Sequence, residues 1–296
     1  MTASHESSDA ATNRTEVHAC SMRRALSPLT EASVPSEILP ALEAVPNFRD
    51  VGGHETADGR RVRTGLLYRS VALDVATDED LATLSELGLR TIFDLRTGME
   101  QERKPDRLPD GAQHMALDLL TDSGEADPTA IFALMDDPPR ASLELADGGT
   151  ERFYVATYRD LIRLESARAG YARLFRTLAS DDGRPALVHC TTGKDRTGWA
   201  VASLLLFLGV RADIVMREYL ISDAEIRRAF GHVVEDFVER GGSLDVIEPL
   251  MSVRPSFIEA ALQAMDADHG SIEAYMREGL GLDDEVLDGL RDAFLE

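Results

Sequence analysis

Hydrophobic and polar positions along the first half of the chain predict short strands joined to helices. Turn-forming residues punctuate the segments VPNFRDVGG and RRVRTGLLYRS, which predicts a hairpin-like entry into the fold. The segment TDEDLATLSELG begins with a capping box of Thr77 and Asp80 and ends at Gly88, which is typical of a complete helix. The apolar runs RTIFDLR and HMALDLL that follow predict two further strands.

Helical periodicity dominates the second half. Helical spacing over FYVATYRDLIRL and YARLFRTLA precedes a short apolar run, GRPALVHC, which predicts a buried strand. The segment RTGWAVASLLLFLG is apolar on nearly every side, so we expect a central buried helix that ends at Gly209. Helical patterns recur in IVMREYL, DAEIRRAFGHVVEDFVERGG, PSFIEAALQAMDADHG and LDDEVLDGLRDAFLE. Together these elements predict an α/β fold with a short central sheet and a helical C-terminal part.

The domain organisation follows from the segments that lack such patterns. Residues 1–32 mix small, polar and charged residues without periodicity, so we expect a disordered N-terminal lead-in. We expect residues 33–296 to form a single domain. Within it, the long polar and proline-bearing stretch 121–150 is predicted to be a lid or insertion, because loops of this length are commonly functional or disordered.

Composition narrows the function classes. The chain of 296 residues has a net charge of −22, which argues against binding to nucleic acid and against stable membrane association. Cys20 and Cys190 are the only cysteines, so a disulfide framework and a cysteine-based zinc site are excluded. No apolar run approaches the length of a membrane span, and no signal peptide is recognisable. We therefore expect a cytoplasmic protein.

The segment HCTTGKDRTG, residues 189–198, places one of the two cysteines between the predicted strand and the predicted central helix. The loop from Cys190 to Arg196 then lies at a helix N-terminus, where inward N–H groups and the helix dipole bind an anion. Gly193 permits the backbone torsion that closes such a cradle. The same field stabilises a thiolate, so we expect Cys190 to act as a nucleophile near neutral pH.

Side chains of this loop supply what its backbone lacks. Arg196 can hold two oxygens of a phosphoryl group with its planar guanidinium, and the Thr197 hydroxyl can donate to the sulfur and ease its departure. Lys194, one of two lysines in the chain, carries a flexible ammonium that can reach outward to a bound phosphate or to a second one. The predicted phosphate-binding set is Thr191, Thr192, Gly193, Lys194 and Thr197.

The spacing Cys-x5-Arg-Thr after a histidine resembles the signature of the cysteine-dependent protein tyrosine phosphatase superfamily. HCxxGKDRTG, together with NFRDVGG at 47–53, GLLYRS at 65–70 and FDLRT at 93–97, is similar to the atypical bacterial tyrosine/serine phosphatase family, the phosphatase-B-like group. The resemblance covers roughly residues 45–220. It implies a tyrosine-phosphatase-like sheet flanked by helices, a helical lid over the pocket, and catalysis without a metal or other cofactor. The implied substrates are phosphotyrosine, often phosphoserine or phosphothreonine, and in some members phosphoinositides.

A general acid must protonate the leaving oxygen. The Trp-Pro-Asp loop of common tyrosine phosphatases is absent, because the only tryptophan, Trp199, lies inside the predicted central helix. The family pattern points to Asp195 as the acid, although neighbouring cations favour its anionic form, and the alternative is that it only ties the loop together. Asp94 is the second candidate, with pairing to an arginine as its more conservative role. Asp118 and Asp122, beside the expected lid, are the remaining candidates.

Several polar residues near the motif have a supporting role as their simplest interpretation. His189 adjoins Cys190, but successive strand residues point to opposite faces, so we expect it to hold the loop through hydrogen bonds. Asn47, Arg49 and Asp50 can either line the mouth of the pocket or stabilise turns, and we favour the second role. The same two roles stay open for Arg63 and Arg69.

These observations predict a metal-independent phosphomonoester hydrolase with Cys190, Arg196 and Asp195 as its catalytic residues. Its expected reaction is dephosphorylation of phosphotyrosine, with phosphoserine and phosphothreonine as further substrates, through a phosphocysteine intermediate. Phosphorylated proteins or small phosphoesters are the expected partners. A phosphoinositide phosphatase is the first alternative, and a non-catalytic phosphate-binding module is the second.

Overall fold

The computed structural model describes residues 42–123 and 134–296. The predicted disordered lead-in, residues 1–32, lies outside these ranges, as do residues 124–133 of the predicted lid. Those two predictions therefore remain predictions. The described ranges include the whole HCTTGKDRTG segment and the elements on either side of it.

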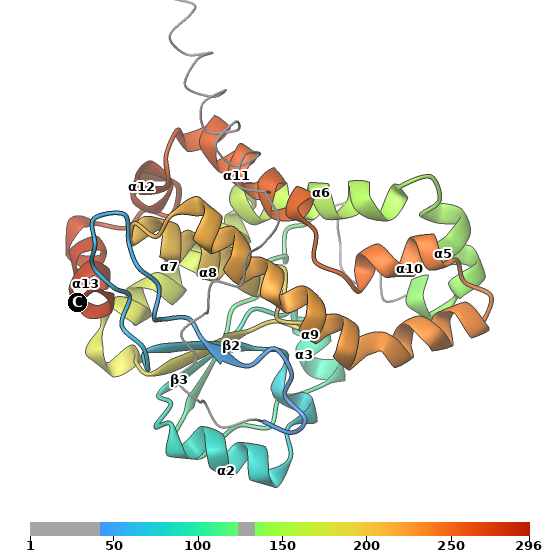
Figure 1. The fold of residues 1–296 in the computed structure, drawn as a ribbon, viewed down its shortest axis with the longest axis horizontal. Helices are drawn as coiled ribbons and strands as arrows, with labels where there is room; N and C mark the ends of the chain where they lie inside the picture. Colours follow the sequence, from blue (N-terminus) through green and yellow to red (C-terminus); the bar gives the residue numbers. More distant parts are fainter. Residues whose placement is uncertain (1–41, 124–133) are drawn as a thin grey trace, which may run out of the picture.

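A short sheet lies at the centre of the described fold, with strand order β1-β2-β5-β3-β4 (Figure 1). β1 pairs antiparallel with β2, as the predicted hairpin-like entry requires, and the other pairings are parallel. The strands are β1 (Arg49–Asp50), β2 (Leu67–Ser70), β3 (Thr91–Asp94), β4 (Gln113–Ala116) and β5 (Ala186–His189). The predicted α/β class is confirmed.

Helices flank the sheet and make up the C-terminal part, as the periodicity predicts. Those before β5 are η1 (Leu73–Val75), α2 (Asp78–Glu86), α3 (Gly98–Arg103), α5 (Pro138–Glu144), α6 (Gly149–Arg163), α7 (Glu165–Ala179) and η2 (Asp181–Gly183). Those after β5 are α8 (Arg196–Phe207), α9 (Ala212–Glu239), α10 (Leu244–Leu250), α11 (Pro255–His269), α12 (Ile272–Ala274), the π-helical turn η3 (Tyr275–Gly279) and α13 (Asp284–Phe294). The segments IVMREYL and DAEIRRAFGHVVEDFVERGG, expected separately, form one continuous helix, α9, which ends at Glu239 before the last three residues of the second segment.

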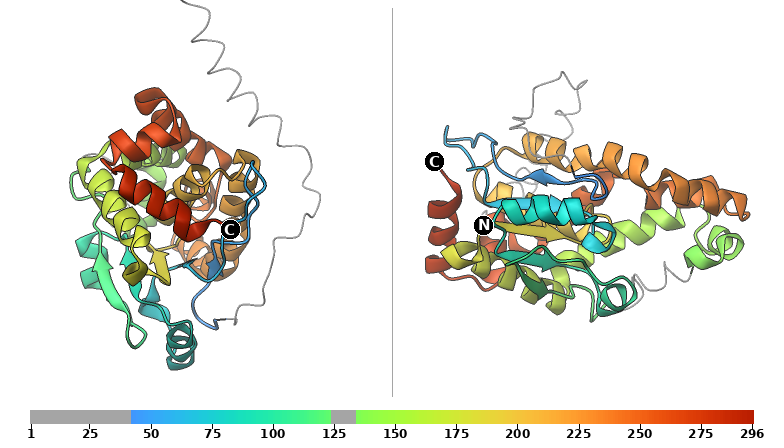
Figure 2. Two further views of the ribbon diagram at one scale, coloured as in Figure 1. Left: turned by 90° about the vertical axis from the view of Figure 1, so that its left-hand side faces the viewer. Right: turned by 90° about the horizontal axis from the view of Figure 1, so that it is seen from below.

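Different helices cover the two faces of the sheet. Along β5 the side chains alternate, because successive residues of a strand point to opposite faces. Leu187 packs in a small cluster with Leu84 of α2, whereas Val188 packs in the large core with Phe175 of α7 and Trp199 of α8. Figure 1 shows α2 below the sheet and α7 and α8 above it, and the right-hand view of Figure 2 shows α2 in front of the strands. Cys190, at the end of β5, belongs to the large core.

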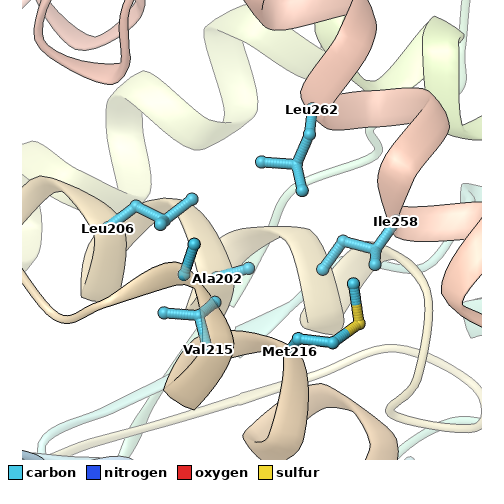
Figure 3. Close-up of a pocket in the computed structure, with 7 residues that line it drawn as sticks. Ala202, Leu206, Val215, Met216, Ile258 and Leu262 are labelled. Atoms are coloured by element: carbon cyan, nitrogen blue, oxygen red, sulfur yellow. The ribbon is translucent and has the colours of Figure 1, made fainter. Parts of the chain in front are cut away.

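The layer above the sheet is closely packed where α8, α9 and α11 meet. Figure 3 shows the apolar seam between them, lined by Ala202, Leu206, Val215, Met216, Ile258 and Leu262. Its free volume is about 10 Å³, which is room for at most one water molecule. This seam is packing between helices and offers no ligand site. Within residues 42–123 and 134–296, no helix has the length and apolar character that crossing a bilayer requires.

Parallel pairing brings the ends of three strands to one edge of the sheet. Ser70 at the end of β2 and Asp94 at the end of β3 are both in register with His189 at the end of β5. The segments that leave these strands therefore start side by side. In open α/β sheets this carboxyl edge is where ligands bind.

Candidate active site

The loop from Cys190 to Asp195 connects β5 with α8 at this edge. Cys190 is 1% exposed, and α8 begins at Arg196. Asp195 occupies the N-cap position, but its side chain makes no capping hydrogen bond to the helix. The first-turn N–H groups are thus left for another acceptor, which suits an anion held above the sulfur. The residues expected to form a phosphate cradle do lie at the N-terminus of this helix.

Gly193 closes the loop as expected. Its φ is +65°, and a Cβ at this position would lie 2.1 Å from the carbonyl oxygen of Ser70. The Gly193 carbonyl accepts hydrogen bonds from Asn47 Nδ2 at 3.0 Å and from Arg69 Nη2 at 2.5 Å. Because a trans peptide points its C=O and N–H in opposite directions, these donors also aim the N–H of Lys194 the other way.

Glu218, on α9, holds the two arginines behind this carbonyl. Arg69 Nη1 donates to Glu218 Oε2 at 2.9 Å, and Arg49 Nε donates to Glu218 Oε1 at 2.8 Å. Ser222, one turn along α9, accepts from both guanidinium groups. Burial alone would raise the pKa of Glu218, but the charges of Arg49 and Arg69 hold that pKa below its ordinary value. Sequence patterns did not suggest Glu218, because only the packing of α9 brings it to the loop.

The contacts of the polar residues around the entry segment match the supporting role. Asn47, Arg49 and Arg69 form the network behind the Gly193 carbonyl. Asp50 accepts hydrogen bonds from the N–H groups of Gly52 and Gly65, both at 2.6 Å, so it stabilises a turn. Arg63 donates to backbone carbonyls near the C-terminal end of the chain, those of residues 292 and 293.

Glu100 of α3 pairs with the guanidinium of Arg196 through both of its oxygens. The distances are 2.5 Å from Nη1 to Oε2 and 2.8 Å from Nη2 to Oε1. The hydroxyl of Thr191 donates to the same carboxylate. Burial would raise the pKa of Glu100, but the charge and hydrogen bonds of Arg196 lower it from 4.5 to about 2. Glu100 is therefore ionised at neutral pH and fixes the guanidinium against the loop.

Glu100 owes its position to a second capping box. Thr97 is the N-cap of α3, its hydroxyl accepts from the N–H of Glu100, and the Glu100 carboxylate accepts from the N–H of Thr97. Sequence reasoning missed this residue, although a signal was present. The pattern Thr-x-x-Glu directly after FDLR, residues 93–96, is the usual sequence of a capping box.

Lys194 lies under the helical layer rather than reaching outward. It is 1% exposed, and its Nζ is 2.9 Å from Asp195 Oδ1. The ammonium also lies 4.1 Å from the centre of the Tyr154 ring and 5.9 Å from that of Phe257. Burial would lower the pKa of Lys194, but the Asp195 carboxylate and the Tyr154 hydroxyl raise it above its ordinary value. The expected outward ammonium is thus, in this structure, a buried and paired one.

Asp195 is bound to the helical layer by tyrosine hydroxyls. Tyr158 of α6 donates to Asp195 Oδ1 at 2.8 Å, and the hydroxyls of Tyr158 and Tyr219 lie 2.7 Å apart. Burial, reinforced by the charge of Asp195, raises the pKa values of both tyrosines well above 10, so both stay protonated. Since the Tyr158 hydroxyl donates its hydrogen bond to Asp195, it accepts one from the hydroxyl of Tyr219 on α9. This chain of hydroxyls joins α6 and α9 to the loop.

Asp94, the second candidate acid, is fully buried and paired with Arg96. Nε and Nη2 of that guanidinium lie 2.9 and 2.8 Å from its two carboxylate oxygens. Burial would raise the pKa of Asp94, but the hydrogen bonds of Arg96 and the charge of His189 hold it far below the ordinary value. The contacts match the conservative alternative, in which this carboxylate pairs with an arginine.

A group that could hold a metal ion lies around this pair. Asp94, Asp106 and His114 bring one ligand atom each to within 4.8 Å of one another. However, Arg96 Nη2 is 2.8 Å from an oxygen of both carboxylates, so the guanidinium already supplies the positive charge at this point. We assign no metal to the cluster.

His189 lies on the face of the sheet opposite to Cys190, as its strand position predicts. Its ring is fully buried, and Nδ1 is 3.2 Å from the carbonyl oxygen of Cys190. Nε2 lies 3.1 Å from Asp106 Oδ2, close enough for attraction, although neither atom is aligned for a hydrogen bond. The contact with the Cys190 carbonyl suits the expected role of holding the loop. Asp106 is a further partner that the sequence did not suggest.

The remaining expected residues are two threonines of the phosphate-binding set and two candidate acids beside the expected lid. The Thr197 hydroxyl is buried and has no hydrogen-bond partner among the described residues, so the expected bond to the sulfur is not formed in this structure. Thr192 takes part through its carbonyl, 3.5 Å from Asn47 Nδ2. Asp118 and Asp122 accept hydrogen bonds from N–H groups at the starts of α3 and α7, so their carboxylates are engaged in capping.

Comparison with known proteins finds similarity to tyrosine phosphatases over most of the chain. A family model described as the tyrosine phosphatase family matches residues 40–296. A protein of Cupriavidus necator whose name places it among the tyrosine-protein phosphatases is 33% identical over 250 residues, 84% of this chain and 86% of the relative. The triple specificity protein phosphatase PtpB of Mycobacterium tuberculosis is 30% identical over 273 residues, covering 84% of this chain and 96% of the relative.

Proposed function

Because this chain belongs to the tyrosine phosphatase family, we propose that its phosphotyrosine hydrolysis proceeds through a phosphocysteine formed on Cys190. The enzyme is a protein-tyrosine phosphatase. Phosphoserine and phosphothreonine are included in the proposed substrate range, in keeping with the triple specificity that the name of the Mycobacterium relative states.

In the first step the Cys190 thiolate attacks phosphorus opposite the tyrosine oxygen. An S–P bond forms while the P–O bond breaks, and Asp195, protonated in the form of the enzyme that reacts, gives its proton to the departing phenolate. The guanidinium of Arg196 and the loop N–H groups bind the equatorial oxygens, where charge accumulates in the transition state. Glu100 holds the guanidinium through its own two contacts, so the fork is oriented before substrate arrives.

In the second step water attacks the phosphocysteine. Asp195, now ionised, takes a proton from the water as the O–P bond forms, and the S–P bond breaks to release phosphate and thiolate. The Thr197 hydroxyl, which has no hydrogen-bond partner among the described residues, is available to donate to the departing sulfur. The hydrogen bond from Tyr158 positions the Asp195 carboxyl group for both transfers.

A single observation carries this proposal. The buried Cys190 begins the loop that leads into α8, the first residue of this helix is an arginine clamped by an ionised glutamate, and donors to the Gly193 carbonyl fix the loop between them. A structural cysteine has no use for this arrangement, since burial in the core would suffice.

The test is to locate the phosphoryl group during turnover. Parent enzyme and Cys190→Ser are mixed with phosphotyrosyl peptide and quenched in acid within milliseconds, and peptides containing residue 190 are analysed by mass spectrometry. We expect phosphorus on Cys190 in the parent, and a loss of kcat/KM on the order of 10⁴-fold or more in Cys190→Ser. Turnover by Cys190→Ser at the parent rate would refute the covalent mechanism. If the parent bound phosphate tightly but hydrolysed no substrate, the protein would be a non-catalytic phosphate-binding module.

Protein substrates are favoured over inositol lipids by the state of Lys194. A basic residue at this position would serve a second lipid phosphate if its ammonium were free. In this structure the ammonium is buried and lies 2.9 Å from Asp195 Oδ1, so it does not reach outward to a second phosphate. Phosphorylated proteins or small phosphoesters are therefore the proposed partners. A cytoplasmic location is proposed from the two-cysteine inventory, which suits a reducing compartment.

A further inference from the structure

A cavity of about 280 Å³ lies beside the phosphate loop, between η1, α3 and α9. Thr191 and Glu100 form its wall toward the loop, while Cys190 and Gly193 do not line it. The wall is tied to the loop directly, since the N–H of Ala72 donates to the carbonyl of Thr191 at 3.2 Å. The cavity is therefore a neighbour of the phosphate cradle rather than the cradle itself.

The cavity has apolar walls that are partly open to solvent. Met99 is 57% exposed and Val75 is 48% exposed, and both stand among the most exposed large hydrophobic residues of the described chain. Phe230 of α9 and the buried Val71 and Ala72 complete the apolar lining. A ligand group that covers these side chains removes apolar surface from water, which favours binding of another apolar side chain.

Two exposed basic side chains line the same cavity, and each is paired with a carboxylate only at long distance. The side chains of Arg103 and Lys104 are 59% and 66% exposed, and their nearest carboxylates, on Asp136 and Asp74, are 3.7 and 3.8 Å away. Arg96, the third cation of the lining, is occupied by Asp94 and Asp106. In a chain with a net charge of −22, an accessible basic pair beside the active site complements a negative group on the substrate.

We propose that this cavity binds the residues that flank the phosphotyrosine, an apolar side chain within two positions of it and a carboxylate next to that side chain. The inference rests on the proposed function, because it assumes that a phosphopeptide occupies the cradle. An extended peptide advances about 3.3 Å per residue, so a residue one or two positions from the phosphotyrosine lies about 3–7 Å from it along the backbone, and its side chain can enter a cavity beside the phosphotyrosine pocket. The acidic surface and the single basic pair fit a peptide better than an anionic lipid surface.

The first measurement compares substrates on the parent enzyme. Two series of phosphotyrosyl peptides carry Leu-Glu, Ala-Ala or Leu-Lys next to the phosphotyrosine, one series on its N-terminal side and the other on its C-terminal side. The small substrate para-nitrophenyl phosphate occupies only the phosphate cradle and is the reference. We expect kcat/KM for the Leu-Glu peptide of one series to exceed that of its Leu-Lys counterpart about tenfold. Equal values for all peptides of both series would overturn the proposal.

The second measurement reverses the basic pair. In Arg103→Glu/Lys104→Glu, the ratio of kcat/KM for Leu-Glu to that for Leu-Lys should fall at least about tenfold. Arg90→Glu is the matched control, because Arg90 is exposed at the opposite end of β3 and should leave the ratio as it is in the parent. An unchanged ratio in the double variant would assign the preference elsewhere and contradict the proposal.

Binding separates failure of this inference from failure of the proposed function. Affinities of the same peptides for Cys190→Ser, measured by fluorescence anisotropy, need no turnover. If the parent hydrolyses none of the substrates but Cys190→Ser still prefers Leu-Glu, the function fails and the cavity assignment stands. A soluble short-chain phosphoinositide that binds tighter than every peptide, and loses that advantage in the double variant, would instead identify the cavity as a lipid headgroup site.

Discussion

Neighbouring side chains of the phosphate loop are held by different kinds of interaction. Glu100 of α3, on the side of the sheet, supplies a buried ionic clamp for Arg196. Aromatic rings and hydroxyls of the helical layer surround Lys194 and Asp195, with Tyr158 as the direct donor to Asp195. The first arrangement fixes a charge that must not move or titrate. The second surrounds the residue that we propose exchanges a proton in each catalytic cycle.

The largest effect should come from breaking the ionic clamp on Arg196 while keeping the positive charge of this residue. Arg196→Lys retains one positive charge but loses the planar fork that bridges Glu100 and two phosphoryl oxygens. We expect kcat to fall about 10²–10³-fold in steady-state assays, as when a transition-state donor is removed. Arg228→Lys, on the exposed surface of α9, is the control. Activity of Arg196→Lys within threefold of the parent would show that the fork is not needed.

The same clamp should make stability depend on acid. The pKa of Glu100 is lowered from 4.5 to about 2 in the folded protein, so the unfolded chain takes up this proton first as pH falls. The contribution is complete above about pH 4.5 and is lost on approaching pH 2, and it amounts to roughly 3 kcal/mol. Urea unfolding of the parent and Glu100→Gln between pH 7 and 3 measures it.

The expected pattern is a difference in unfolding free energy that narrows as pH falls. Glu144→Gln is the matched control, because Glu144 lies on α5 and pairs with Arg140 at the exposed surface. A constant difference between the parent and Glu100→Gln across this range would mean that the carboxylate does not carry the acid sensitivity.

The smallest effect should come from removing the Tyr158 hydroxyl that donates to Asp195. Tyr158→Phe removes the hydrogen bond to Asp195 but keeps the ring, so we expect kcat to fall about three- to tenfold. Tyr275→Phe is the control, since its hydroxyl bonds Trp199 away from the loop. A kcat within twofold of the parent in Tyr158→Phe would show that this hydrogen bond does not assist Asp195.

Local patterns predicted the elements of the fold and the loop itself. The strand before Cys190, the helix after it, the capping box of Thr77 and the torsion of Gly193 all depend on neighbouring residues, which is why they could be predicted. Thr97 and Glu100 were equally local and were overlooked. The site roles of Cys190, Arg196 and Asp195 remain predictions that the geometry supports.

Residues brought in by distant packing could not be predicted in this way. Glu218 pairs with Arg49 across 169 positions of the chain, and Tyr158 approaches Asp195 from a helix earlier in the chain. Lys194 illustrates the same limit, because its surroundings of Tyr154 and Phe257 depend on how α6 and α11 pack. A basic residue in an isolated motif is expected to be exposed, and only the helical layer makes it buried.

The length of α9 links parts of the molecule that would otherwise be independent. Its 28 residues form a rod of roughly 42 Å, which Figure 1 shows running from the centre of the fold toward α5 and α10. Near its start stand Glu218 and Tyr219, further along Phe230, and near its far end Phe237, in contact with α10 residues. The arginine network, the tyrosine pair and the flanking cavity therefore share one helix, so a change in the orientation of α9 would displace parts of all three together.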